Sequence, residues 1–257
     1  MNLTLPLVVK DIHFSYDKKE VLKGIGGSFF EGTFYSIVGP NGSGKTTWLK
    51  LIAGINPLQS GSVELFGTSI AELSNKDVAK YLSFVPQMFN IQYAFTVEEV
   101  VAMGRYPYMS RFAMLSEEDN GLVQMALEET NLMPLKDRYV NELSGGELQR
   151  VIIARAIAQD TDIIVLDEPI SHLDIHYQYS IVTLLKRLCR ERKKTVITVL
   201  HDLNVTMNHC DHIFLIKDGK VMIEGEPLKV LSEEVVQKVY GLQVKIVETD
   251  EEKWITW

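Results

Sequence analysis

Short runs of apolar residues alternate along this chain with longer stretches of helical periodicity. The runs are rich in β-branched and aromatic residues, which is typical of strands that are buried on both faces. Such strands alternating with helices predict an α/β fold built on a largely parallel sheet. The expected central strands are Phe34–Val38, Tyr81–Val85, Ile163–Leu166, Val196–Leu200 and Ile213–Ile216.

Two parts of the chain break this alternation. The segments Leu7–Phe14 and Ser62–Phe66 predict strands of a smaller antiparallel β layer. Between residues 88 and 159 the pattern becomes mostly helical, and the expected helices are Val97–Met103, Glu117–Asn131 and Glu147–Gln159. We expect a single domain over residues 1–257, with a core at 1–87 and 160–246, an inserted helical subdomain at 88–159 and a short C-terminal tail at 247–257, for which the sequence predicts no structure.

The bulk composition is that of an ordinary globular protein, with 46% hydrophobic and 23% charged residues. A net charge of −8 argues against unassisted binding to nucleic acid or to anionic lipid. No apolar run approaches the roughly 20 residues that span a bilayer, and the N-terminus lacks the pattern of a signal peptide. We therefore expect a cytoplasmic chain whose membrane association, if any, goes through a protein partner.

Two smaller features have ordinary explanations. Two cysteines, Cys189 and Cys210, are too few for a disulfide framework or a zinc site. A basic run could suggest a nucleic-acid patch, but cations favour helix C-termini, so we interpret it as a solvated helix end. The run consists of Arg187, Arg190, Arg192, Lys193 and Lys194.

The strongest chemical signal is a glycine-rich stretch between a predicted strand and a predicted helix. It fits G-x-x-x-x-G-K-[ST], the phosphate-binding P-loop. Its glycines permit backbone conformations closed to other residues, so that N–H groups and a helix N-terminus surround the phosphates. We expect Lys45 to reach the β- and γ-phosphates of ATP and the hydroxyl of Thr46 to ligate Mg²⁺. The predicted nucleotide-binding residues of this loop are Gly39, Pro40, Asn41, Gly42, Ser43, Gly44, Lys45, Thr46 and Thr47.

Acidic residues follow a second buried strand. Ile163–Leu166 leads directly into Asp167 and Glu168, which places both carboxylates at the carboxyl edge of the sheet, beside the P-loop. We expect Asp167 to bind Mg²⁺ through water and Glu168 to act as the general base on the attacking water. His201 follows the next strand and emerges at the same edge, where it can contact the γ-phosphate.

The residues from Leu143 to Glu147, Leu-Ser-Gly-Gly-Glu, resemble the signature sequence of ABC-type ATPases. Other elements match that family in order over about Leu7 to Leu242. Tyr16 resembles the aromatic residue that stacks on adenine, and Gln87 resembles the Q-loop glutamine, which makes it a candidate for catalysis and for Mg²⁺ binding. Ser171–Asp174 resembles the D-loop, and His201 the switch histidine. The resemblance implies that the catalytic residues are Glu168, His201, Gln87 and Lys45.

The signature also has a physical interpretation. Ser144, Gly145 and Gly146 open a predicted helix and present a hydroxyl and free N–H groups to an anion. The P-loop already serves the phosphates on its own side, so a second phosphate-seeking helix terminus suits an ATP bound by another subunit. The resemblance implies this arrangement: a head-to-tail homodimer that holds two ATP molecules between P-loop and signature, with Asp174 at the same interface.

The segment Val97–Tyr108 and the sequences around the D-loop and His201 are similar to those of importers for iron-siderophore, haem and cobalamin. The resemblance implies a subunit that docks near Gln87 and Val97–Tyr108 onto a membrane permease, at the cytoplasmic face of the membrane. It implies an indirect link to a solute-binding protein and no nucleic-acid partner. Exposed aromatic residues near a hinge favour such an interface.

Three other classes of function are alternatives. A nucleic-acid-repair ATPase of the same superfamily would need a long coiled-coil insertion, and there is no heptad run. The best non-transport alternative is a soluble ABC ATPase of iron–sulfur cluster assembly, which would lack the importer-like segment Gly104–Pro107. A metal site at His172 and His176 has suitable i, i+4 spacing, but no third strong ligand is evident.

Overall fold

The central sheet positions the rest of the protein. In the computed structural model, which describes residues 5–89, 93–110, 113–171, 173–248 and 253–256, the sheet has the strand order β10-β9-β3-β8-β7-β6. All of its pairings are parallel except that of the edge strand β10 with β9. The five predicted central strands are confirmed, and no end is shifted by more than one residue. The bounds are β3 Phe34–Val38, β6 Leu82–Val85, β7 Ile163–Asp167, β8 Thr195–Val199, β9 His212–Lys217 and β10 Lys220–Gly225.

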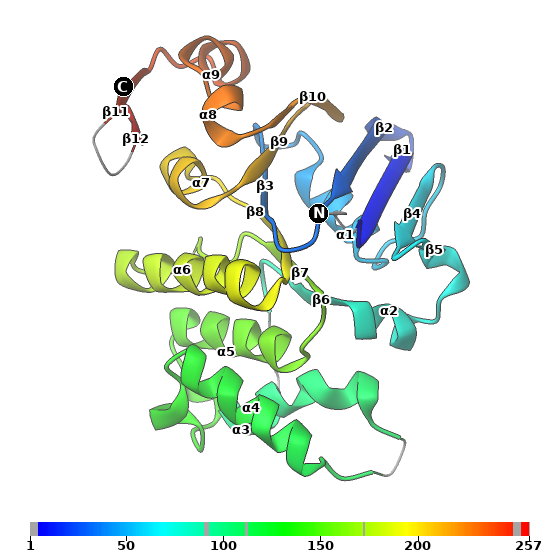
Figure 1. Ribbon diagram of the computed structural model, residues 1–257, viewed down its shortest axis with the longest axis vertical. Helices are drawn as coiled ribbons and strands as arrows, with labels where there is room; N and C mark the ends of the chain where they lie inside the picture. Colours follow the sequence, from blue (N-terminus) through cyan, green and yellow to red (C-terminus); the bar gives the residue numbers. More distant parts are fainter. Residues whose placement is uncertain (1–4, 90–92, 111–112, 172, 249–252, 257) are drawn as a thin grey trace.

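The predicted antiparallel layer is a second sheet with the order β2-β1-β4-β5. It lies beside the central sheet, with α1 between the two (Figure 1). Its longest strand, β2, was not predicted, because three glycines depress its strand propensity. One of them, Gly27, has a packing reason: a Cβ there would lie 2.8 Å from the Phe214 ring. The bounds are β1 Leu7–Tyr16, β2 Lys19–Phe29, β4 Ser62–Leu65, β5 Thr68–Ser69 and α1 Lys45–Ile52.

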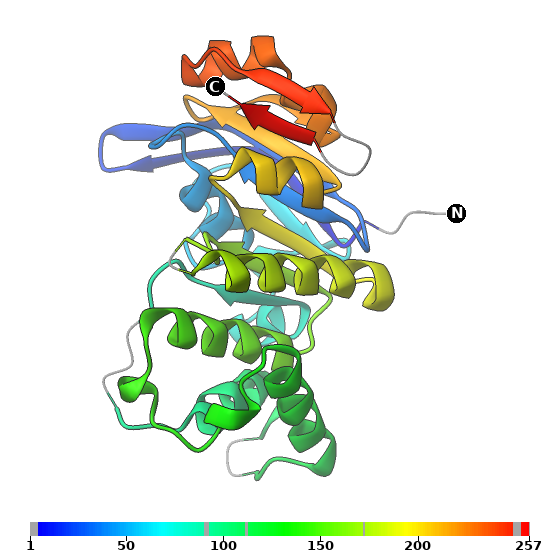
Figure 2. The same ribbon diagram turned by 90° about the vertical axis from the view of Figure 1, so that its left-hand side faces the viewer.

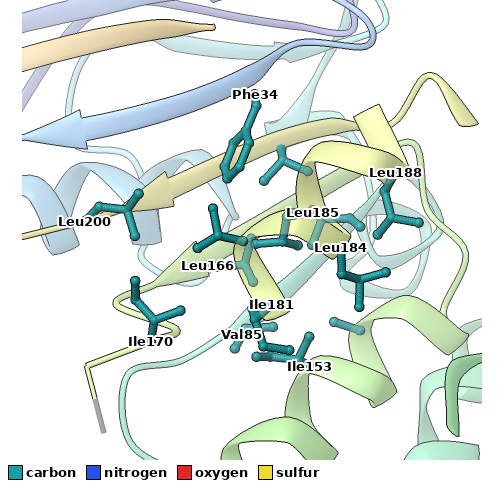
Figure 3. Close-up of a cluster of buried hydrophobic side chains, with 14 of the residues drawn as sticks. Phe34, Val85, Ile153, Leu166, Ile170, Ile181, Leu184, Leu185, Leu188 and Leu200 are labelled. Carbon is teal, nitrogen blue, oxygen red and sulfur yellow. The ribbon is translucent and has the colours of Figure 1, made fainter. Parts of the chain in front are cut away.

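Helices α5 and α6 cover the other face of the central sheet (Figure 2). The apolar residues of α6, among them Ile181 and Leu185, pack with Phe34 and Leu166 of the sheet and with Ile153 of α5 (Figure 3). A single buried cluster therefore joins the sheet to the helical region. The bounds are α5 Gly145–Ala158 and α6 Ile175–Arg192.

The helical character of residues 88–159 is confirmed where the structure describes them. α5 begins two residues before the predicted start, because Ser144 is its N-cap, and a 3₁₀ helix continues α3 as far as Tyr108. α6 ends at Arg192, as the basic run predicted, and Arg187 and Arg192 both pair with Glu129 of α4. The bounds here are α3 Val97–Ala102, η2 Met103–Tyr108, α4 Glu117–Glu129, η3 Met133–Leu135 and η4 Val140–Glu142.

The C-terminal tail, for which no structure was predicted, pairs β11 with β12, and β12 packs against α7. Both lie at the upper left in Figure 1, beside the central sheet. Among the described residues, no helix is long and apolar enough to cross a bilayer. The remaining bounds are η1 Ile70–Glu72, α2 Asn75–Tyr81, α7 Leu203–His209, α8 Pro227–Val230, α9 Glu233–Tyr240, β11 Lys245–Glu248 and β12 Lys253–Thr256.

A buried arginine fixes the importer-like segment to the rest of the helical region. Arg105 donates from Nε to Asp119 Oδ1 of α4 over 2.7 Å, and from a terminal nitrogen to the carbonyls of Ala158 and Gln159, each at 2.9 Å. Hydrogen bonds from Ser116 and Arg105 lower the pKa of Asp119 to about 2. Gly104, the residue before Arg105, must also be glycine, because a Cβ there would lie 2.3 Å from the carbonyl oxygen of Arg155.

We expect Arg105→Met to lower the free energy of unfolding by about 3–5 kcal/mol, because it leaves the partly buried carboxylate of Asp119 and two carbonyls without their donor. Arg190→Met, at an exposed position of α6, is the matched control and should change it by less than about 0.5 kcal/mol. Urea unfolding followed by circular dichroism measures both. Equal stability of the two variants would contradict the anchoring role.

Candidate functional site

The P-loop connects β3 to α1 and is held by its surroundings. At Gly39 the backbone has φ +150°, and a Cβ would lie 2.0 Å from the carbonyl oxygen of Ile216, so only glycine fits. Gly44, with φ +103°, is the N-cap of α1. The turn between β9 and β10 braces the loop from outside, because Gly219 donates its N–H to the carbonyl of Ser43 over 3.2 Å. The loop is thus shaped by fixed backbone contacts.

The P-loop lysine is buried inside this loop. Lys45 is 6% exposed, and its Nζ donates to the carbonyls of Gly39 at 2.9 Å and Pro40 at 3.0 Å. Burial lowers the pKa of Lys45, and the nearby carboxylates of Glu168 and Asp167 oppose that shift. The ammonium is therefore held over the loop, where a phosphate would meet it.

The two predicted Mg²⁺ ligands at the loop and at β7 lie together. The hydroxyl of Thr46 donates to Asp167 Oδ1 over 3.0 Å. Asp167 is 2% exposed; burial raises its pKa, while the hydrogen bond from Thr46 lowers it. Carboxylate and hydroxyl oxygens at the carboxyl end of a strand suit a small hard cation such as Mg²⁺.

Three predicted catalytic residues from three separate strand ends also meet. Gln87, two residues beyond β6, donates from Nε2 to Glu168 Oε2 over 2.7 Å. His201, two residues beyond β8, places Nε2 2.5 Å from Glu168 Oε1. Glu168 itself has φ +51°, a conformation that costs a non-glycine residue of order 1–3 kcal/mol and that is common at functional sites. Both oxygens of this carboxylate are therefore fixed in a strained turn.

A cavity of about 630 Å³ lies over the loop. Tyr16, 49% exposed at the end of β1, forms one wall, and Glu168 forms part of another. The Tyr16 ring stands edge-on to Phe14, and its hydroxyl accepts from Asn56 Nδ2 over 3.2 Å. Further cavity residues, contributed by β2 and by the β9–β10 turn, were not predicted from the sequence, although an Asp-Gly pair is a strong hairpin signal. These residues are Lys19, Glu20, Val21, Lys23, Asp218 and Gly219.

The signature residues do not line this cavity. Ser144 caps α5, and its hydroxyl donates to Glu147 Oε2 over 2.7 Å, so the serine is engaged in a capping box with Glu147. Gly145 is exposed, with open space where a Cβ would lie. Asp174 caps α6 by accepting the N–H of Tyr177 over 3.1 Å. Within one chain, then, the signature and the D-loop aspartate cap helices apart from the P-loop cavity.

The alternative metal site receives no support from the described residues. His172 lies outside the residues that the structure describes. Elsewhere in the described ranges, no group of three or more His, Cys, Asp or Glu side chains could hold a metal ion.

Comparisons with known proteins agree with this geometry. The ABC transporter family model matches residues 22–171. The chain is 36% identical to an iron(3+)-hydroxamate import ATP-binding protein of Bacillus subtilis (strain 168), over 94% of this chain and 90% of the relative. The chain therefore belongs to the ABC transporter family. Within that family it is an ATP-binding chain and an ATPase coupled to transport, as the sequence predicted.

Solved structures agree as well. A metal-chelate type ABC transporter in an inward-facing conformation matches with a TM-score of 0.83 and 28% identity, over 98% of this chain and 96% of that one. A dimeric ATP-binding cassette in a post-hydrolysis state, bound to ADP and Pi, matches with a TM-score of 0.76 and 33% identity, over 86% of this chain and 98% of that one. The predicted fold, a P-loop NTPase core with an antiparallel layer and an inserted helical region, is thereby confirmed.

Gly39→Ala and Gly42→Ala separate backbone strain from side-chain overlap. Both positions have positive φ, but a Cβ at Gly42 meets nothing within 4 Å. We expect Gly39→Ala to lower the free energy of unfolding by about 3 kcal/mol or more, and Gly42→Ala by about 1–2 kcal/mol. Urea unfolding without nucleotide measures both. If Gly39→Ala were the milder change, the loop would not depend on its approach to Ile216.

Proposed function

We propose that this chain is the ATP-hydrolysing subunit of an importer for an iron-siderophore or a related metal chelate, with haem and cobalamin in the same class. The relative of Bacillus subtilis (strain 168) is an iron(3+)-hydroxamate import ATP-binding protein, and a structural match over 98% of this chain is a metal-chelate type ABC transporter. These import relatives favour this function over iron–sulfur cluster assembly. The subunit would act at the cytoplasmic face of the membrane, through a permease that receives its substrate from a solute-binding protein.

The observation that carries the catalytic proposal is the position of Glu168. Its carboxylate lies at the edge of the P-loop cavity, with Gln87 on one oxygen and His201 on the other. We assign Glu168 as the general base that accepts a proton from the attacking water. Gln87 orients this carboxylate. His201 lies at the same edge of the central sheet, and once ATP binds we expect its imidazole to contact the γ-phosphate in place of Glu168. Lys45 exchanges loop carbonyls for phosphate oxygens, and Tyr16 stacks on adenine.

Mg²⁺ fits the oxygen pair of Thr46 and Asp167, which are 3.0 Å apart beside the buried lysine. When bound there it neutralises charge on the β- and γ-phosphates. Gln87 is the third candidate ligand from the sequence. In this structure its amide nitrogen is directed to Glu168, which leaves the amide oxygen as the atom for a metal.

Dimerisation follows from the position of the signature. The first N–H groups of α5 lack partners within the helix, and Gly145 is open to solvent. We propose that these groups meet the phosphates in the P-loop of a second copy, so that two ATP molecules join a head-to-tail homodimer. The dimeric cassette bound to ADP and Pi supports this arrangement.

The permease surface is proposed near Gln87 and Val97–Tyr108. Val97, Val100 and Arg105 of that segment are buried, whereas Tyr106 is 59% exposed and Tyr108 is 41% exposed. Exposed apolar side chains flank it in the sequence on both sides, and an exposed apolar surface of this kind suits a protein partner. They are Met88, 83% exposed, Tyr93, 72% exposed, and Met114, 91% exposed.

Glu168→Gln should lower steady-state ATPase activity by at least about 10²–10⁴-fold, because an amide cannot accept the proton of the attacking water. ATP affinity should be retained, because the P-loop is unchanged. Glu64→Gln, which alters a surface ion pair with Lys10, is the control and should leave both unchanged. Near-normal turnover in Glu168→Gln would remove this residue from the role.

Gly145→Leu tests the shared site. A Cβ at Gly145 meets nothing within 4 Å of its own chain, and in the proposed dimer the leucine side chain would project toward a nucleotide bound by the partner. In a Glu168→Gln background saturated with Mg-ATP, we expect it to abolish the dimer seen by sedimentation and to leave ATP binding by the monomer intact. Gly121→Leu in α4, equally open, should leave the dimer intact. A dimer unaffected by Gly145→Leu would contradict the head-to-tail arrangement.

A further inference from the structure

An apolar surface lies where α6, α7 and β12 meet. Three large side chains stand exposed there: Ile175 (83%), Tyr179 (61%) and Trp254 (43%). They surround a hollow of about 300 Å³ that Val182 and Val205 also line. The three elements follow one another on one face of the molecule (Figure 2), and all three lie on the left in Figure 1. Exposed apolar side chains gathered in this way mark a contact surface.

The Trp254 side of this surface is fixed by two asparagines of α7. Asn204 Nδ2 donates to the carbonyl of Ile255 over 3.3 Å, and its Oδ1 accepts the N–H of Ile255 over 2.6 Å. Asn208 makes the same pair of bonds with Lys253, at 2.8 and 3.1 Å. Because Ile255 is buried and side chains alternate along a strand, Trp254 points outward. The two side-chain amides therefore hold β12 in one register on α7.

Several polar atoms around the hollow are already engaged. Besides the asparagine amides, Asp202 Oδ1 accepts the N–H groups of Asn204 and Val205, and Gln178 Nε2 donates to the carbonyl of Leu173. What the surface offers is mainly apolar area around an aromatic ring, which is the composition of the centre of a protein–protein interface. Its occupant is therefore a protein surface rather than a polar small molecule.

The position of the surface identifies that protein. Ile175 directly follows Asp174 of the D-loop, and Asp202 directly follows His201, so the patch continues the edge on which the proposed ATP-bound dimer closes. In a two-fold dimer, a patch beside the axis meets the same patch of the other copy. We propose that Ile175, Tyr179 and Trp254 form a contact between two copies of this chain. The inference rests on the proposed homodimer and extends it.

This contact involves no nucleotide atom. It therefore holds the two copies together at one edge while the P-loop and signature surfaces separate after hydrolysis. The subunits open about this edge instead of dissociating. The clamp of Asn204 and Asn208 keeps Trp254 in place during that movement.

Ile175→Glu tests the patch. The variant should fold, because Ile175 is 83% exposed and begins α6, where a negative charge is favourable. In a Glu168→Gln background with Mg-ATP, we expect the dimer dissociation constant from analytical ultracentrifugation to rise by about tenfold or more. Tyr179→Glu, about one turn further along the same side of the helix, should act in the same direction. Ile55→Glu, 51% exposed after α1, is the matched control and should change the constant by less than about twofold.

The outcomes separate this inference from the proposed function. If Glu168→Gln alone stays monomeric with Mg-ATP, the homodimer itself fails, and the patch contact fails with it. If Glu168→Gln dimerises and both Ile175→Glu and Tyr179→Glu dimerise as tightly as Ile55→Glu, the patch inference is overturned and the homodimer stands. A rise in the dissociation constant confined to the two patch variants supports the contact.

Discussion

The register of the buried parallel strands holds the whole site together. β3 supplies the P-loop, β7 ends in Asp167 and Glu168, and β8 leads to His201, while the pairing of Asp167 with Val199 fixes how far each strand extends. A slip of one residue would send every side chain of a strand to the opposite face, which the two apolar layers around this sheet do not permit. Burial of aliphatic residues such as Ile164 and Val196 fixes the register of the strands. The register in turn sets the distances among the polar groups at the strand ends, which lie far apart in the sequence.

The residues of the site were predictable because their spacing expresses a physical requirement. Gly39 occupies a position where no other residue fits, and the acidic pair Asp167 and Glu168 ends an apolar strand. Both features can be recognised in the sequence without a structure. The same holds for the five central strands, whose β-branched residues are buried on both faces. β2 escaped prediction because its three glycines lower the strand propensity, and the packing of Gly27 against Phe214 and Trp48 is a tertiary contact. The strand propensity of single residues gives no information about such tertiary contacts.

The C-terminal tail was unpredictable for a related reason. Its strand β12 depends on hydrogen bonds from Asn204 and Asn208, about fifty residues earlier in the sequence. Nothing in the acidic and aromatic composition of the tail indicates that partner. The link between Gln87 and Glu168 was similarly out of reach: each residue was identified by its motif, but their direct hydrogen bond depends on how β6 lies beside β7. Motifs identified the participants, and the fold determined which of them touch.

The two carbonyls under Lys45 have a consequence for exchange of nucleotide. An ammonium buried in this loop would be costly unless nearby groups accepted its hydrogen bonds. The carbonyls of Gly39 and Pro40 do so, and their dipoles stabilise the charge of Lys45. When a phosphate binds, the Lys45 ammonium exchanges carbonyl acceptors for phosphate oxygens. When the phosphate leaves, the carbonyls can accept the hydrogen bonds again. Rapid turnover of this site is therefore compatible with a rigid scaffold.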